Sequence, residues 1–154
     1  AGQKAEEKGY SQVLWLDGVE RKYIEEVGAM NVMFRIGDEI VTPALTGSIL
    51  PGISRMSCIE LLQKKGYRVS ERLLSLEELE QSMKNNTLLE AWGCGTAAVV
   101  SPIGELAYRD EVFTVSGGKI GEITQMLYDT LTGIQWGTLA DDFGWTHPIP
   151  AKKQ

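Results

Sequence analysis

Metal-binding side chains and long apolar runs are scarce in this sequence. Cysteine occurs only at Cys58 and Cys94 and histidine only at His147. These are too few for the four nitrogen or sulfur ligands of a structural zinc site, or for a disulfide framework. No stretch approaches the roughly 20 consecutive apolar residues that cross a bilayer, and no secretion signal opens the chain. We therefore expect a cytoplasmic protein with no metal site and no membrane partner.

Basic residues are also in the minority. Fifteen Lys and Arg residues against 21 Asp and Glu residues give a net charge of −6, which argues against a nucleic-acid partner. The 154 residues are 43% hydrophobic and 23% charged, as in an ordinary globular protein of one domain. We expect the main domain over residues 10–148, the tail of a preceding helix in residues 1–9, and a short tail in residues 149–154.

Short runs of β-forming residues separated by turns dominate the first third of the chain. Strands are predicted over 12–16, 23–27, 31–36 and 39–42, and the turn pairs Asp17-Gly18 and Gly37-Asp38 make them an antiparallel meander. Helices are predicted over 53–66, 75–84 and 120–131, and further strands over 67–73, 88–92, 97–101 and 111–115. This order indicates an α+β, or mixed α/β, domain.

A capping box is expected at the second of these helices. Ser75 occupies the N-cap position, and Glu78 stands where its side chain reaches back to the N-cap.

A Pro-Gly turn directly precedes the predicted helix at residue 53. The N–H groups of Ile53 and Ser54 then have no partner within the helix, and such a helix start binds anions, phosphate especially. Ser54 adds a hydroxyl and Arg55 a guanidinium group. The alternative is a plain Pro-Gly helix start with no ligand.

A glycine-rich turn, Gly93-Cys94-Gly95-Thr96-Ala97-Ala98, joins two predicted strands. Its glycines allow the backbone to approach a ligand closely, and Thr96 offers a hydroxyl. The alternative is a tight hairpin. Two turns suited to phosphate in one small domain fit a single phosphorylated cofactor held from two sides.

Adjacent carboxylates, Glu25 and Glu26, occur within a predicted half-buried strand. Because side chains alternate along a strand, one carboxylate should face solvent and the other the interior. A buried carboxylate needs a partner, for which a protonated ring nitrogen is suitable. The alternative is that both carboxylates are solvated.

Taken together, these motifs resemble one family, the branched-chain amino-acid aminotransferases of the fold-type IV class of pyridoxal-phosphate enzymes. The resemblance extends from about Tyr10 to Pro148. It rests on Gln12-Val13-Leu14-Trp15-Leu16-Asp17-Gly18, Glu26-Val27-Gly28-Ala29-Met30-Asn31, Leu50-Pro51-Gly52-Ile53-Ser54-Arg55, Gly93-Cys94-Gly95-Thr96-Ala97-Ala98 and Gly133-Ile134-Gln135-Trp136-Gly137. It implies the large domain of that fold, in which antiparallel and mixed strands form a pseudo-barrel with helices packed outside.

The resemblance also implies roles for individual residues. Glu26 would hold the pyridine nitrogen of pyridoxal 5′-phosphate in its protonated form. Ile53 and Ser54 would bind the phosphate, with Thr96 on its other side. Thr96 and the backbone of Ala97 would receive the substrate carboxylate. The implied reaction is transamination of leucine, isoleucine or valine with 2-oxoglutarate by a homodimer.

The lysine that carries the cofactor in this family lies shortly before the position of Gly9, and no lysine of this chain matches it. Lys4, Lys8 and Lys119 fall elsewhere. We therefore expect the chain to be the C-terminal cofactor-binding domain of a longer enzyme, without catalytic residues or useful transaminase activity by itself. The alternatives are a D-amino-acid aminotransferase, an aminodeoxychorismate-lyase-like enzyme, and a non-catalytic domain that retains the fold.

Overall fold

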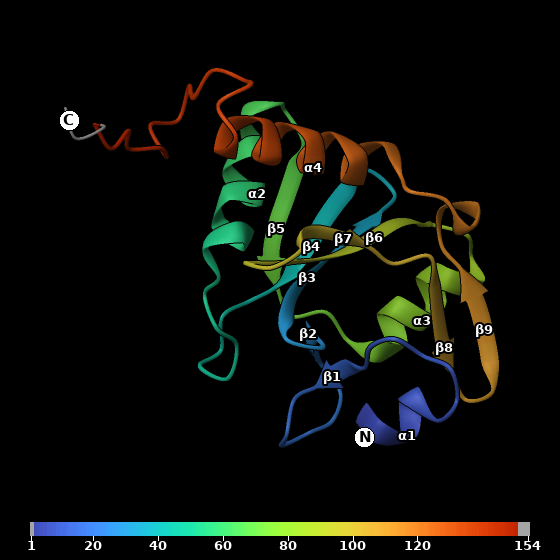
Figure 1. The fold of residues 1–154 in the computed structure, drawn as a ribbon. Helices are drawn as coiled ribbons and strands as arrows, with labels where there is room; N and C mark the ends of the chain where they lie inside the picture. Colours follow the sequence, from blue (N-terminus) through green and yellow to red (C-terminus); the bar gives the residue numbers. More distant parts are fainter. Residues whose placement is uncertain (1, 151–154) are drawn as a thin grey trace.

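A curved sheet of seven strands forms the centre of the computed structural model, which describes residues 2–150, and helices pack against it (Figure 1). The helices are α1 (Gly2–Glu6), α2 (Ile53–Lys64), α3 (Leu76–Lys84) and α4 (Glu122–Gln135), with a short 3-10 turn over Ser116–Gly118. The strands are β1 (Leu14–Leu16), β2 (Ile24–Val27), β3 (Met30–Ile36), β4 (Glu39–Pro43), β5 (Arg68–Arg72), β6 (Leu88–Gly95), β7 (Val99–Pro102), β8 (Glu105–Tyr108) and β9 (Glu111–Thr114). Strands β8 and β9 form a separate hairpin.

The sheet forks along β3. One edge of β3 pairs with β6 from Asn31 to Ile36, whereas the other edge pairs first with β2, at Asn31, and then with β4, from Phe34 onward. Pro43 at the end of β4 has no N–H to donate, so β4 cannot extend the antiparallel ladder toward the start of β3. At the fork the hydroxyl of Thr42 donates to the carbonyl of Val32 at 2.9 Å.

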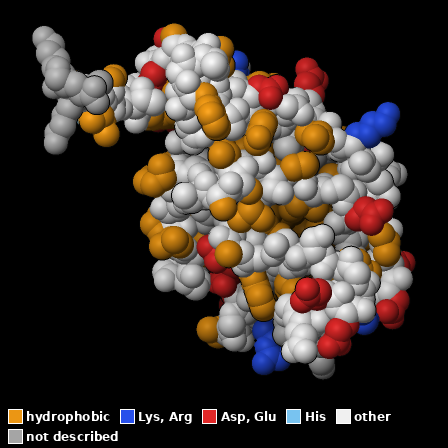
Figure 2. Space-filling view, in the orientation of Figure 1, with side chains coloured by type: hydrophobic (Ala, Val, Ile, Leu, Met, Phe, Trp, Pro, Cys, Tyr) orange, Lys and Arg blue, Asp and Glu red, His pale blue; other side chains and the backbone are white. Residues whose placement is uncertain are grey.

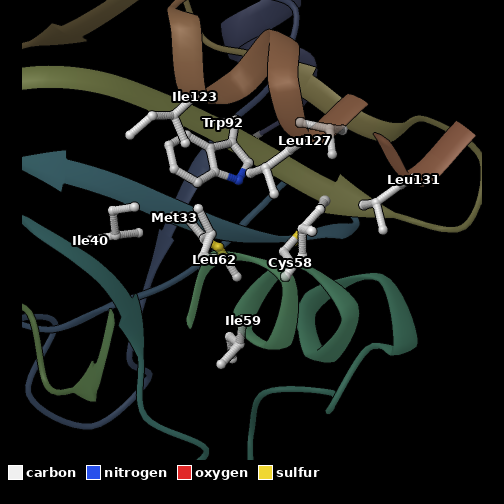
Figure 3. Packing of buried hydrophobic residues seen from close by; sticks show 12 residues of the cluster. Met33, Ile40, Cys58, Ile59, Leu62, Trp92, Ile123, Leu127 and Leu131 are labelled. Atoms are coloured by element: carbon white, nitrogen blue, oxygen red, sulfur yellow. The ribbon is translucent and has the colours of Figure 1, made fainter. Parts of the chain in front are cut away.

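Two hydrophobic cores lie on the opposite faces of this sheet. On one face α2 and α4 cover Met33, Trp92 and Cys94, and Figure 3 shows Trp92 and Met33 between Cys58 and Leu62 of α2 and Leu127 of α4. On the other face α3 and the β8–β9 hairpin cover Val32, Phe34 and their neighbours. Successive residues of β3 therefore contribute to different cores, as period-two alternation requires.

A carboxylate from the sheet caps the start of α4. Glu90 is 3% exposed and accepts hydrogen bonds from the N–H groups of Ile123 and Thr124, at 3.1 and 2.9 Å. The hydroxyl of Thr124 and the guanidinium of Arg35 complete its shell, at 2.9 and 3.1 Å. The first turn of α4 has no side-chain cap of its own, so Glu90 supplies the missing acceptor.

The predicted fold class is confirmed, with local corrections. Ser75 does accept from the N–H of Glu78, but the Glu78 carboxylate pairs with Arg72 at 2.6 Å instead of reaching back to the N-cap. The last helix continues beyond Leu131 to Gln135. The strand β8 was not predicted at all.

Candidate functional site

Three strands bring one row of side chains to the face of the sheet that α2 covers. Glu26 of β2 lies directly opposite Asn31 of β3, which lies opposite Cys94 of β6. Directly paired residues point to the same side of a sheet, with Cβ atoms about 4.5–5.5 Å apart. Met33 follows Asn31 on this face and packs with α2, so the row faces the α2 side.

The start of α2 lies against the centre of this row. Asn31 is 6% exposed, and its Nδ2 donates to the carbonyl of Leu50 at 2.8 Å. Its Oδ1 lies so close to Gly52 that a methyl group at that glycine would collide with it. The contact explains why the turn before the helix carries glycine.

The helix mouth, which we define as Gly52, Ile53 and Ser54, has free donors. Gly52 is the N-cap and offers no side chain to the helix. In the part of the chain that the structure describes, the N–H groups of Ile53 and Ser54 donate to no protein acceptor. A helix start of this kind attracts an anion through its free donors and the helix dipole.

Arg55 holds the first turn of α2 from behind and does not reach the helix mouth. Its side chain is 2% exposed, and its Nη2 donates to the carbonyl of Pro43 at 3.0 Å and to Glu71 at 2.8 Å. The expectation that Arg55 adds a donor to a bound anion is therefore wrong, because both contacts direct the guanidinium toward the ends of β4 and β5.

The turn between β6 and β7 lies beside the helix mouth. Thr96 and Ala97 are exposed in this turn, which Val99 closes by pairing with Gly95. A cavity of about 160 Å³ adjoins the turn and is lined by Ile53 and Ser54 together with Val99. Figure 1 shows the tip of the β6–β7 hairpin near the start of α2.

Val99 has a φ of +56°, which is unusual for a β-branched residue. Val99 is the first residue of β7 and directly follows the three turn residues Thr96, Ala97 and Ala98, a place where a left-handed conformation is normally taken by glycine. Strain of this kind costs about 1–3 kcal/mol and tends to occur at functional sites.

Glu25 and Glu26 do not divide between solvent and interior as alternation predicts, because both are half-buried. The carboxylate of Glu25 accepts a hydrogen bond from Ser48, in the loop before α2. Glu26 accepts none from the residues that the structure describes, and so it is free to bind a ligand.

Two thiols lie behind the site. Cys58 is one helical turn after Ser54, and Cys94 is two residues before Thr96; both are buried. A hydrogen bond with Cys94, together with burial, raises the pKa of the Cys58 thiol, so this thiol stays neutral. Both residues belong to the hydrophobic core on the α2 side of the sheet.

The structure thus brings together the residues that the sequence analysis singled out: Glu26 at one end, and Ile53, Ser54, Thr96 and Ala97 at the other. Sequence reasoning missed Asn31, which joins the two ends. The available signal was a polar residue at the start of the predicted strand over 31–36, directly before the apolar run Val32-Met33-Phe34.

Apolar side chains are exposed at the helix mouth and elsewhere on the surface. Figure 2 shows apolar side chains gathered in a hollow across the middle of one face of the molecule. Leu50 and Ile53, at the helix mouth, are 74% and 72% exposed.

Among the helices of residues 2–150, none has the length and apolar character needed to cross a membrane.

The chain belongs to the class IV aminotransferase family. A family model described as Amino-transferase class IV matches residues 1–106. Among curated relatives, the chain is 58% identical over 151 residues to branched-chain-amino-acid aminotransferase 2 of Bacillus subtilis, and 45% identical to the branched-chain-amino-acid aminotransferase of Mycolicibacterium smegmatis. These matches cover 98% and 92% of this chain but 42% and 40% of the relatives, so the chain spans about two fifths of their length.

Solved structures with the same fold include two branched-chain amino acid aminotransferases. The Escherichia coli enzyme has a TM-score of 0.78 and 30% identity, over 94% of this chain and 44% of that one. The T.th. enzyme, complexed with N-(5′-phosphopyridoxyl)-L-glutamate, has a TM-score of 0.76 and 24% identity, over 94% and 44% of the two chains. The predicted resemblance is thereby confirmed at the level of family and fold.

Proposed function

We propose that this chain forms the cofactor-binding part of a branched-chain amino-acid aminotransferase that uses pyridoxal 5′-phosphate. The observation that carries the proposal is the placement of two features on the same face of one sheet: the half-buried carboxylate of Glu26, to which no residue within 2–150 donates, and a donor-rich helix mouth. Pyridoxal phosphate has a basic ring nitrogen and, on an arm from another ring position, a dianionic phosphate, so its chemistry matches both ends of the site.

The residues present fit this group at each contact. The carboxylate of Glu26 favours the protonated form of a pyridine nitrogen beside it. The N–H groups of Ile53 and Ser54 bind phosphate oxygens, and the exposed hydroxyl of Thr96 donates from the other side. When bound, the cofactor supplies an electron sink for the α-carbon of an amino acid.

The substrates follow from the relatives and from the surface of the site. We propose leucine, isoleucine and valine as amino donors and 2-oxoglutarate as acceptor, with Thr96 and the backbone of Ala97 at the substrate carboxylate. The exposed apolar side chains of Leu50 and Ile53 provide a surface for aliphatic substrate groups. We further propose a cytoplasmic homodimer.

Binding of pyridoxamine 5′-phosphate to the purified chain tests the cofactor site without requiring turnover. We expect Glu26→Gln to weaken binding about tenfold, the equivalent of about 1.4 kcal/mol, because the ring nitrogen loses its opposite charge. Glu105→Gln, at an exposed carboxylate on β8, is the matched control and should leave the affinity unchanged. Isothermal titration calorimetry measures both. A wild-type chain that folds, as circular dichroism would show, but gives a flat titration would refute the proposal in favour of a non-catalytic domain.

The substrate class requires a separate assay on an enzyme preparation that includes this chain. Rates with leucine, isoleucine and valine should exceed those with D-alanine. Faster turnover of D-alanine would favour a D-amino-acid aminotransferase.

A further inference from the structure

We infer that Asn31 is a positioning residue that sets the spacing between the two ends of the cofactor site, an inference that rests on the function proposed above. Asn31 faces Glu26 directly across the β2–β3 pair. Its side chain also contacts both Leu50 and Gly52 in the turn that leads into α2. The Asn31 side chain thus contacts the helix mouth, while the Asn31 backbone pairs with β2, the strand that carries Glu26.

The contact is specific in two ways. Asn31 Nδ2 donates to the carbonyl of Leu50 at 2.8 Å, and the same carbonyl accepts the N–H of Gly52 at 2.8 Å, which closes the turn. Asn31 Oδ1 lies against the α-carbon of Gly52 and occupies the space that a methyl group on this carbon would need. The hydrogen bond therefore limits how far the helix mouth can move from β3, and the steric contact limits how closely it can approach.

The fork in the sheet leaves this link to side chains: Asn31 makes the buried one, and Ser48 of the same loop makes an exposed one to Glu25. After Asn31, β3 leaves β2 and pairs with β4, so backbone hydrogen bonds do not connect the β2 branch to the segment that leads from β4 into α2. Asn31 is buried, so its hydrogen bond is shielded from competing water. On the opposite branch Arg55 fixes the first turn of α2 to Pro43 and Glu71.

A ligand that engages both ends of the site depends on their spacing, whereas a ligand that engages one end does not. The second contact of a two-ended ligand gains from the effective concentration created by the first, and this gain disappears when the geometry no longer matches. Pyridoxamine 5′-phosphate is a two-ended ligand here, and inorganic phosphate a one-ended ligand. Loss of Asn31 should therefore weaken binding of the first far more than binding of the second.

The test compares Asn31→Leu, which keeps the approximate shape and removes the hydrogen bond, with wild type. We expect affinity for pyridoxamine 5′-phosphate, measured by calorimetry, to fall at least tenfold. Affinity for inorganic phosphate, measured by phosphorus NMR line broadening, should change less than twofold. Ser82→Ala is the control, because it removes a buried hydrogen bond of 2.7 Å to Leu79 in α3, on the opposite face of the sheet. It should change neither affinity.

Asn31→Ala provides a second route to the same result. It removes both the hydrogen bond to Leu50 and the steric contact with Gly52 without adding bulk, so it should also weaken pyridoxamine phosphate selectively. This variant decides the outcome if Asn31→Leu does not fold.

Equal losses for both ligands would show a merely structural role and overturn the inference, as would unchanged binding of both in a folded variant. Wild type that binds neither ligand would instead overturn the proposed function, and this inference with it.

Discussion

Replacing Glu90 by glutamine removes the charge that caps α4 while keeping the size of the side chain. The carboxylate is 3% exposed and accepts from two backbone N–H groups, one hydroxyl and one guanidinium. All four of these partners are donors. A glutamine at this position keeps one acceptor oxygen, but its NH₂ group replaces the other and faces N–H or O–H donors that then have no acceptor.

The expected cost follows from these contacts. Loss of a charge at a partly buried helix start costs up to about 2 kcal/mol. A buried donor without an acceptor costs about 1–3 kcal/mol more. Arg35 is one-third exposed and regains water, so it adds little. We therefore expect Glu90→Gln to lower the free energy of unfolding by about 2–4 kcal/mol, or roughly 4–16 °C in Tm for a chain of this size.

Urea denaturation followed by far-ultraviolet circular dichroism measures this loss. Glu105→Gln, an exposed carboxylate with the same substitution, should stay within about 0.5 kcal/mol of wild type. Thr124→Val removes a single donor to Glu90 and should cost about 1 kcal/mol. If Glu90→Gln were as stable as Glu105→Gln, the view that this carboxylate holds α4 on the sheet would be refuted.

Two further predictions concern charges. Glu71→Ala should destabilise the chain by about 2 kcal/mol although Glu71 is half exposed, because it leaves the buried Arg55 guanidinium with a single carbonyl partner. Adding Arg55→Met should restore part of this loss. If the urea midpoints of the two substitutions were simply additive, the prediction would be contradicted. The backbone N–H of Tyr23, with those of its neighbours, lowers the pKa of Asp17 from 3.8 to about 2. Because the folded pKa is depressed, the stabilisation is complete above about pH 4 and is lost as the pH falls toward 2, so urea midpoints of Asp17→Asn should vary less with pH in that window than those of wild type.

Local signals predicted the elements whose turns carry glycine, proline or a capping residue. Gly37-Asp38 ends β3 and Ser75 caps α3, as expected. The hairpin of β8 and β9 was missed in part because its turn is made by Arg109 and Asp110, which adopt φ of +48° and +66° without glycine or asparagine.

Tertiary partners account for the remaining differences. The cap of α4 comes from Glu90, 33 residues before Ile123, and no local pattern indicates such a contact. From the sequence, Arg55 could either bind an anion or form a buried ion pair, because the position of β5, which carries Glu71, is not known. Glu26, Ile53, Ser54 and Thr96 could be selected from motifs, but the residue that joins them depends on the strand register.

The forked sheet leaves one joint without a continuous backbone ladder. At that joint a single hydroxyl, from Thr42, satisfies the carbonyl of Val32, and β6 alone runs past both branches of the fork. The N–H of Ile24 on the β2 branch donates at 2.8 Å to the carbonyl of Leu74, which follows β5 on the other branch, so one backbone bond spans the open side of the fork. Sequence changes that widened the angle between the branches would have to break this bond, so it holds the curvature of the sheet where the ladder is interrupted.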